Sequence, residues 1–314
     1  NVPAQHACIA ALTEGLEAPQ HMNKAYIERR DYLITTLKSL GFELNAKPEG
    51  AFYIFPSIKN YTEDDFNFCV DVLEKAESLK KKSGRPHTLA IEDQLLLTLN
   101  YLRSYNTQLE LAANYHIAES NVNRTIKKVE DALMKSRRFT LPKRSITTAD
   151  EHFNWVIIDA TECSIERPKK NQNKFYSGKK KKHTLKAQVI YHPKSKQIIG
   201  LDISNGSQHD IKLARKTVKK FKHCEYVMTD LGYYGLEQDG FKLLMPIKKK
   251  KNFPLFDAEK NYNKMIGKIR VVIEHINSQL KTFRILSERY RNRRKRFGLR
   301  INLIAALVNR INLQ

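Results

Sequence analysis

Trp155-Val156-Ile157-Ile158-Asp159-Ala160-Thr161 places a carboxylate directly after a run of apolar residues, a pattern that predicts a strand with a buried face. The same order recurs in Tyr226-Val227-Met228-Thr229-Asp230 and Arg270-Val271-Val272-Ile273-Glu274. A carboxylate beside buried apolar residues is costly unless a cation compensates its charge. Carboxylate oxygens are the ligands that hard divalent cations such as Mg²⁺ prefer. The three acidic residues therefore predict a metal-dependent site of the kind that a nuclease uses.

The charge of the chain indicates the class of substrate. Its 314 residues include 56 Lys and Arg against 33 Asp and Glu, a formal net charge of +23. Residues 1–76 are acidic, with 7 basic and 11 acidic residues, so the whole positive excess lies after residue 76. Such an excess bears on binding partners rather than on the fold, and it favours a polyphosphate substrate.

The cysteines and the apolar runs bear on the compartment. Cys8, Cys69, Cys163 and Cys224 are far apart, a spacing that indicates neither a zinc site nor a disulfide framework and favours the reducing cytoplasm. No apolar run in the sequence reaches the roughly 20 residues of a membrane span, and no signal peptide opens it. The segment 299–313 is interrupted by polar residues and predicts an amphipathic helix packed on a core.

A change of composition marks the best domain boundary. Lys80-Lys81-Lys82-Ser83-Gly84-Arg85-Pro86 predicts a solvated basic linker, which we place at residues 77–86. Within residues 1–76 we expect helices over residues 4–16, 22–40 and 63–76 and a short strand over residues 50–55.

Residues 87–139 have a helical period throughout. We expect a first helix from about Ile91, a short second helix over residues 109–115, and a third helix capped by Ser120. The apolar face of the third helix carries Val122, Ile126, Val129 and Leu133, and its polar face carries Asn121, Arg124, Thr125 and Lys128. This arrangement is typical of a helix-turn-helix that inserts its third helix into the major groove. A three-helix bundle with a solvated basic face is the alternative.

Strands and helices mix from residue 153 to residue 314. We expect strands over residues 155–161, 183–191, 197–203 and 226–230, and helices over residues 210–222 and 262–283. This order is that of an RNase-H-like α/β domain with a mixed sheet. The expected architecture is therefore an α+β segment over residues 1–76, a linker over residues 77–86, a helical DNA-binding domain over residues 87–139 and an RNase-H-like catalytic domain over residues 153–314.

Residues 87–314 resemble the DDE transposases of bacterial insertion sequences. The motifs that carry the resemblance are Ile158-Asp159-Ala160-Thr161-Glu162, Tyr176-Ser177-Gly178-Lys179-Lys180-Lys181, Asp230-Leu231-Gly232-Tyr233-Tyr234-Gly235, and Arg270, Glu274 and Lys281 on one expected helix. Gly267 stands where the family has a Tyr, a departure that bears on a DNA contact rather than on the metal site.

The resemblance implies two-metal phosphoryl transfer on DNA. Asp159, Asp230 and Glu274 would be the catalytic ligands of two Mg²⁺ or Mn²⁺ ions. The implied partners are the terminal inverted repeats and a target DNA, bound by a homo-oligomer that is at least a dimer. Asp210 would cap a helix or serve as a substitute ligand, and Tyr233 and Tyr234 would stack on a base or pack beneath the strand. The DNA contacts expected are Asn121, Arg124, Lys128, Lys179, Lys180, Lys181, Arg270 and Lys281.

The first 76 residues resemble the small C-terminal domain of pyridoxal-phosphate aminotransferases. The resemblance rests on Asn1-Val2-Pro3-Ala4-Gln5, Arg29-Arg30-Asp31 and Pro48-Glu49-Gly50-Ala51-Phe52-Tyr53-Ile54-Phe55-Pro56. The family's Schiff-base Lys and carboxylate-binding Arg have no match, so we expect no bound pyridoxal phosphate. The leading hypothesis is a transposase fused behind this fragment. An inactive DNA-binding repressor of the element and an aminotransferase are the alternatives.

Overall fold

The computed structural model describes residues 10, 13, 17–42, 44, 65–79, 87–142, 155–218, 226–239, 242–249 and 253–312. The chain divides into two compact units, residues 1–68 and 69–314. The described part of the first unit contains α2 (Glu17–Ser39), which covers the helix predicted over residues 22–40 and begins earlier. Several of its large apolar side chains are exposed, among them Met22, Tyr32 and Leu33. The strand predicted over residues 50–55 and most of the helix predicted over residues 4–16 lie outside the described residues.

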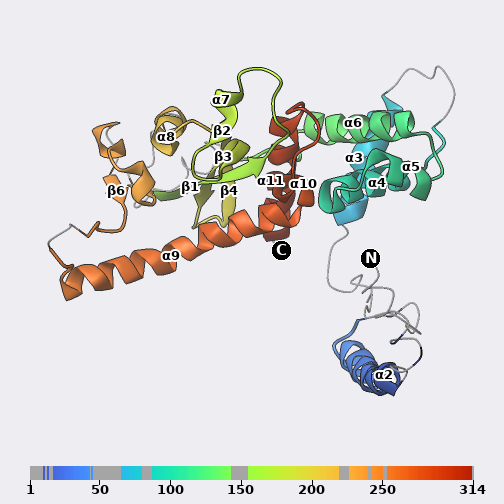
Figure 1. Cartoon of the computed structure of the whole chain (residues 1–314). Helices are drawn as coiled ribbons and strands as arrows, with labels where there is room; N and C mark the ends of the chain where they lie inside the picture. The colour runs from blue at the N-terminus through green and yellow to red at the C-terminus, as the bar shows by residue number, and fades with distance from the viewer. Residues whose placement is uncertain are drawn as a thin grey trace. The chain divides into compact units, whose positions relative to one another are not determined.

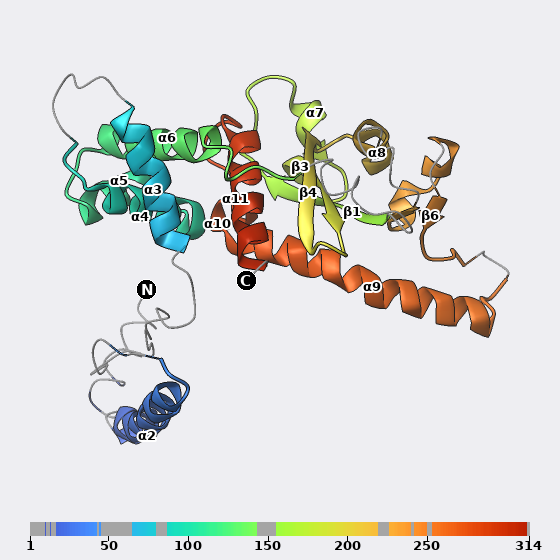
Figure 2. The ribbon, with the colours of Figure 1, turned by 180° about the vertical axis from the view of Figure 1, so that it is seen from behind.

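The second unit begins within α3 (Asp65–Ser78), whose residues Cys69, Val70, Val72 and Leu73 are buried. The helical domain follows with α4 (Ile91–Ser104), α5 (Gln108–Asn114) and α6 (Glu119–Lys135). In both views of the ribbon α3 lies beside this bundle (Figures 1 and 2). The three helices predicted over residues 87–139 are confirmed as α4, α5 and α6.

Two details of α6 differ from the prediction. The helix begins at Glu119 and its N-cap is Ala118, so Ser120 lies in the first turn and is not the cap. Thr125 is buried, although it was expected on the polar face. Thr125 lies three residues after Val122 and four before Val129, and these spacings place it on the buried face of the helix.

A six-stranded mixed sheet forms the centre of the remaining chain. Its strands are β1 (Trp155–Ser164), β2 (Tyr176–Ser177), β3 (Lys182–His192), β4 (Gln197–Asn205), β5 (Tyr226–Met228) and β6 (Lys242–Leu244). Strands β4, β3 and β1 are antiparallel neighbours, whereas β1, β5 and β6 are parallel neighbours. This order confirms the RNase-H-like α/β fold. Strand β1 is longer than predicted, because it stays paired with β3 beyond Asp159 as far as Ser164.

Helices cover both faces of the sheet. Helix α8 (Asp210–Val218) and the short helices η3 (Leu231–Tyr233) and η4 (Leu236–Asp239) pack on one face through Val156 and Ile158. Helix α9 (Asp257–Thr282) lies on the opposite side of the sheet from α8 (Figures 1 and 2). The remaining helices are α7 (Gln172–Phe175), α10 (Arg284–Ser287) and α11 (Phe297–Asn312). The helix predicted over residues 299–313 is confirmed as α11, most of whose apolar residues are buried.

A buried polar network joins the helical domain to the catalytic domain. Glu130 of α6 is fully buried, and its two carboxylate oxygens accept hydrogen bonds from Arg296 Nε and Arg300 Nε, each at 2.6 Å. The guanidinium of Arg300 also lies over the ring of Tyr101, with 5.1 Å between Cζ and the ring centroid. Buried charges are tolerated when they are paired in this way. The network therefore fixes α6 against α11.

Among the described helices, none combines the length and the apolar character needed to cross a membrane.

Candidate active site

Asp159 is presented by β1 toward α9. Because side chains alternate along a strand, Val156 and Ile158 point to the α8 face and Asp159 points to the other. There its Oδ2 accepts a hydrogen bond of 2.7 Å from Asn277 Nδ2 of α9. The pKa of Asp159 is raised to about 6: burial is the largest cause and the carboxylates of Asp230 and Asp210 add to it, whereas the backbone N–H of Ala160 and the charge of Arg270 oppose the rise.

Asp230 follows the strand that runs parallel to β1. The last paired residues of these strands are Ile157 and Met228, so continuing the register by two residues brings Asp230 opposite Asp159. Neighbouring strands lie about 4.8 Å apart, which is close enough for the two carboxylates to share a cation. Asp230 Oδ1 also accepts a hydrogen bond of 2.9 Å from Gly232 N. A Cβ at Gly232 would lie 3.0 Å from that same oxygen, so a side chain there would press on the carboxylate of Asp230.

Glu274 and Asp159 line one cavity of about 420 Å³, together with Asn277, Lys179, Lys180 and Lys281. Glu274 is exposed on α9, and Arg270 lies one turn before it. The structure thus brings Asp159 and Asp230 to one edge of the sheet, and Asp159 and Glu274 to one cavity. Within the described ranges, however, no group of three or more His, Cys, Asp or Glu side chains is suitable for holding a metal ion.

Several polar atoms around Asp159 have no hydrogen-bond partner. Asn277 Oδ1, the Tyr233 hydroxyl and Arg270 Nε are buried and unsatisfied. Burial raises the pKa of Tyr233 well above its usual value, and the nearby charges of Asp159, Asp210 and Asp230 add to the effect. Buried polar atoms normally have partners, so these unsatisfied atoms are ones that a water or an ion could satisfy. The oxygens of Asn277, Tyr233 and the carboxylates are of the kind that a hard divalent cation prefers as ligands, so these residues fit such an ion chemically.

The sequence did not reveal that Glu162 and Asp210, which also line this cavity, are held by one lysine. Lys186 Nζ donates to Asp210 Oδ1 and to the carbonyl of Gln208, both at 2.8 Å, and lies 3.9 Å from Glu162 Oε1. Thr184 Oγ1 donates to the other oxygen of Glu162 at 2.7 Å. Asp210, considered as a helix cap or substitute ligand, therefore forms an ion pair with Lys186. The sequence does contain a sign of this cluster, because Glu162 and Lys186 fall in two strands that pair with each other and lie opposite one another in that pairing.

The two tyrosines after Asp230 have different environments. Tyr233 is buried in the core under the sheet, and Tyr234 is 73% exposed. Packing therefore accounts for Tyr233, whereas Tyr234 is available to a ligand. Asn277 is a further site residue that sequence reasoning missed, although it lies three positions after Glu274 and hence on the same face of α9.

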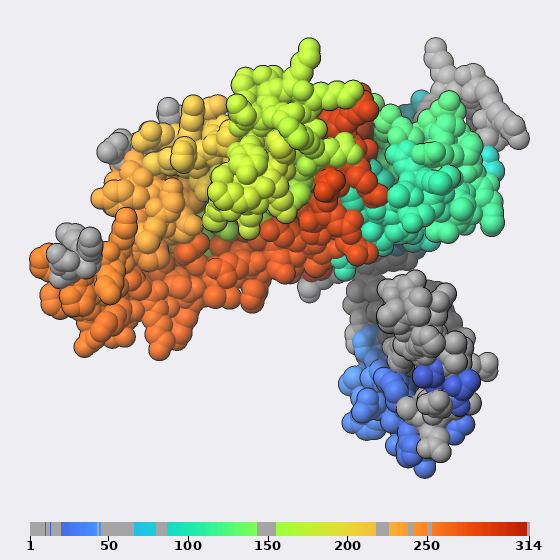
Figure 3. All heavy atoms as spheres, viewed as in Figure 1, coloured from blue at the N-terminus to red at the C-terminus, as the bar shows by residue number. Residues whose placement is uncertain are grey.

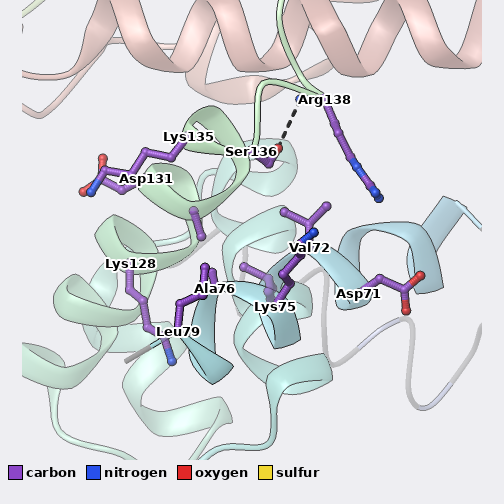
Figure 4. Close-up of a pocket in the computed structure, with 12 residues that line it drawn as sticks. Asp71, Val72, Lys75, Ala76, Leu79, Lys128, Asp131, Lys135, Ser136 and Arg138 are labelled. Carbon is purple, nitrogen blue, oxygen red and sulfur yellow. Dashed lines mark hydrogen bonds between the residues drawn. The ribbon is translucent and has the colours of Figure 1, made fainter. Parts of the chain in front are cut away.

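The predicted DNA-contacting residues fall into two groups. Asn121 and Arg124 are exposed at the start of α6, and Arg124 Nη1 donates to Asn121 Oδ1 at 3.3 Å. Lys128 is turned to the interior of the bundle, where it donates to Gln94 Oε1 at 2.8 Å and pairs with Glu77 of α3 at 2.8 Å. A cavity of about 710 Å³ lies between α3 and α6 there (Figure 4).

The second group surrounds the acidic cavity. Lys179 and Lys180 line it after β2, and Lys281 lines it from the end of α9. Lys181 is exposed in the same turn as Lys179 and Lys180. Arg270 is half-buried and acts electrostatically on Asp159. The carboxylates are thus bordered by cations able to hold an anionic substrate.

Comparison with known families and proteins agrees with this geometry. Residues 158–309 match the family described as DDE superfamily endonuclease, and residues 87–139 match the helix-turn-helix of DDE superfamily endonuclease. The chain is 43% identical over 256 residues to a probable transposase for insertion sequence element IS702 of Microchaete diplosiphon, covering 81% of this chain and 93% of that protein. It is 23% identical over 227 residues to a putative transposase for insertion sequence element IS112 of Streptomyces albus G, covering 71% and 81%.

A shorter similarity concerns a different class of protein. Over 73 residues the chain is 41% identical to a probable N-acetyl-LL-diaminopimelate aminotransferase of Bacillus subtilis, covering 23% of this chain and 18% of that enzyme. The aminotransferase-like fragment is therefore a small part of such an enzyme. Among solved structures, the piggyBac transposase synaptic complex with hairpin DNA aligns with a TM-score of 0.41 and 14% identity, covering 81% of this chain and 72% of that one.

Proposed function

The chain belongs to the DDE superfamily of insertion-sequence transposases, and we propose that it binds the ends of its element and catalyses metal-dependent DNA strand cleavage and strand transfer. The observation that supports the proposal is the parallel register of β1 and β5, because Asp159 and Asp230 each lie two positions after the last residues that these strands pair, Ile157 and Met228. Glu274 lines the same cavity as Asp159, and lysines border it. Adjacent carboxylates with a cationic border suit metal-assisted phosphoryl transfer.

The carboxylates of Asp159, Asp230 and Glu274 would hold Mg²⁺ or Mn²⁺, two ions per site. When bound, such ions supply activation of the attacking oxygen and stabilisation of the leaving oxygen. Asn277 orients Asp159 through its hydrogen bond. With a pKa of about 6, Asp159 is mostly ionised at neutral pH, which is the form that a cation requires.

The cations around the cavity would position the DNA. Lys179, Lys180 and Lys281 would neutralise phosphate oxygens on either side of the scissile bond. In the first reaction a water attacks the phosphorus and the 3′ oxygen leaves, which frees the 3′ end of the element. In the second reaction that 3′-hydroxyl attacks a phosphorus of the target strand and displaces another 3′ oxygen. Both are direct displacements without a covalent enzyme intermediate.

Recognition of the terminal repeats is assigned to α6. Asn121 and Arg124 are exposed at its first turns, where a recognition helix contacts base edges. Two ends of the element must meet before strand transfer, so the active form would be at least a dimer on DNA. Binding to DNA would place the protein on the nucleoid in the cytoplasm.

The test is cleavage of supercoiled DNA that carries the terminal repeats. We expect nicking at the repeat ends with Mg²⁺, none with EDTA, and loss of nicking in Asp230→Asn. Asp257→Asn is the matched control, because its side chain is 91% exposed at the start of α9. Repeat binding without cleavage by the unchanged protein would contradict the proposal and favour the repressor. Absorbance from bound pyridoxal phosphate would instead favour an aminotransferase.

A further inference from the structure

A basic groove is lined neither by Asp159, Asp230 and Glu274 nor by residues of α6. Its volume is about 800 Å³, and it is formed by the loop before α7, by α7 itself and by the segment that precedes α11. Six cations line it, with Glu166 as the single carboxylate. These cations are Arg167, Lys169, Lys170, Lys174, Arg293 and Arg294.

The cations of this groove are presented to solvent and are not neutralised. All six are exposed. In the part of the chain that the structure describes, none of them forms a salt bridge. Arg294 is oriented by the ring of Phe175, with 4.3 Å between Cζ and the ring centroid, and Arg167 Nε donates to Gln172 Oε1 at 3.0 Å. Like charges held this close repel one another, so the groove favours an anionic ligand that contacts several of them.

The backbone of the groove is also strained. Asn171, Arg293 and Arg294 have φ values of 56°, 45° and 67°, in the left-handed region that arginine rarely adopts. Strain of this kind persists where the surrounding contacts impose it, and it is concentrated at functional positions. Here both of the consecutive arginines, Arg293 and Arg294, line the groove.

The groove has links both to the helical domain that contains α6 and to the cavity lined by Asp159 and Glu274. On one side Arg296 pairs with Glu130 of α6, and Asn292 Nδ2 donates to the hydroxyl of Tyr101 in α4 at 2.7 Å. On the other side α7 leads through β2 directly to Lys179 and Lys180, which line the acidic cavity. Figure 3 shows the yellow-green surface around α7 in contact with the red surface of the C-terminal segment.

We propose that this groove binds the DNA backbone of the element end, between the repeat held by α6 and the phosphate that is cleaved. A duplex leaving α6 toward the carboxylates would meet six cations spaced along its path, and the segment that supplies two of them is anchored to α6. The proposal rests on the proposed function. Its ligand is the phosphate backbone, which carries no sequence information but sets the register of the DNA.

The experiment compares Lys169→Ala/Lys170→Ala with Lys212→Ala/Lys216→Ala, a control that removes two exposed lysines from α8. Each protein is titrated with two duplexes between about 50 and 200 mM salt. One carries the complete element end, and the other lacks the base pairs next to the cleaved phosphate. Because each phosphate contact contributes about 0.9 to the slope of log K against log salt, the groove variant should lose about 1.8 on the complete end. On the shortened end the slope of the groove variant should equal that of the unchanged protein. The control variant should have the slope of the unchanged protein on both duplexes.

Other results would overturn the proposal. An unchanged slope on the complete end, an equal loss on both duplexes, or an equal loss in the control would each do so. A defect confined to strand transfer, with end binding intact, would assign the groove to target DNA instead. The titrations measure DNA binding and do not require cleavage. They would therefore still test the groove if the protein proved unable to cut DNA.

Discussion

Asp159 is partly buried beside two other carboxylates, and burial raises its pKa from 3.8 to about 6. The folded protein therefore holds a proton at Asp159 more tightly than the unfolded chain does. Between pH 4 and pH 6 the unfolded chain releases that proton first, so the stability contributed by this residue falls as the pH rises through the window. Above pH 6 the loss of stability remains at its full value, unless a cation compensates the charge of the carboxylate.

Asp159→Asn should therefore stabilise the protein while abolishing cleavage. A shift of about 2 pKa units corresponds to roughly 3 kcal/mol, and partial solvent exposure reduces the expected gain in unfolding free energy to about 1–2 kcal/mol at pH 7 in EDTA. The measurement is thermal unfolding at pH 4 and pH 7. Mg²⁺ should raise the melting temperature of the unchanged protein and leave that of the variant alone. A variant less stable than the unchanged protein at pH 7 would contradict this account of the carboxyl.

Gly232 provides a second test at this scale. A Cβ there would lie 3.0 Å from Asp230 Oδ1, so Gly232→Ala should displace the carboxylate and lower the rate of nicking by at least about tenfold, which corresponds to about 1.4 kcal/mol. Gly178→Ala is the matched control, because no atom of the described residues would lie within 4 Å of a Cβ at that position. Equal nicking by both variants would show that the position of Asp230 is not critical.

At the scale of elements, periodicity predicted most of the fold. The apolar spacing of residues 91–133 indicated three helices, and alternating or continuous apolar runs indicated β1, β3, β4 and β5 near their observed positions. The contacts between elements were harder to predict, because they join residues distant in sequence. Lys186 meets Asp210 across 24 positions, and Asn277 meets Asp159 across 118. Glu130 stands between Val129 and Asp131 in the sequence, and its burial depends on its tertiary partners, Arg296 and Arg300.

Lys128 shows how an added element changes a predicted contact. The periodicity of α6 puts this residue on the DNA side, but Glu77 of α3 and Gln94 of α4 hold it. Glu77→Ala should release the lysine toward DNA and steepen the salt dependence of repeat binding by about 0.9. Glu74→Ala removes an exposed carboxylate of the same helix and is the control. If both variants bind as the unchanged protein does, Lys128 is a structural residue of the bundle.

At the scale of the whole molecule, the second unit combines the helix-turn-helix and the candidate active site in one compact unit. Glu130, Arg296 and Arg300 form the junction between the two parts, and Asp131 pairs with Arg296 beside them. Because Glu130 and Arg300 are both buried, neither can be hydrated if its partner is lost. The junction is therefore stable only when it is complete.

Removing one member should cost more than removing both. Glu130→Ala leaves Arg300 buried and unpaired, and we expect the free energy of unfolding to fall by about 3–5 kcal/mol. In Glu130→Met/Arg300→Met, apolar side chains of similar size replace the principal buried pair, and most of that loss should be recovered. Chemical denaturation measures both effects, with Glu119→Ala as the control at an exposed position of α6. If the double variant recovers stability but cuts at scattered positions near the repeat, the charged junction holds α6 in register with the carboxylates. Recovery of stability together with cleavage at the original position would show that packing alone keeps that register.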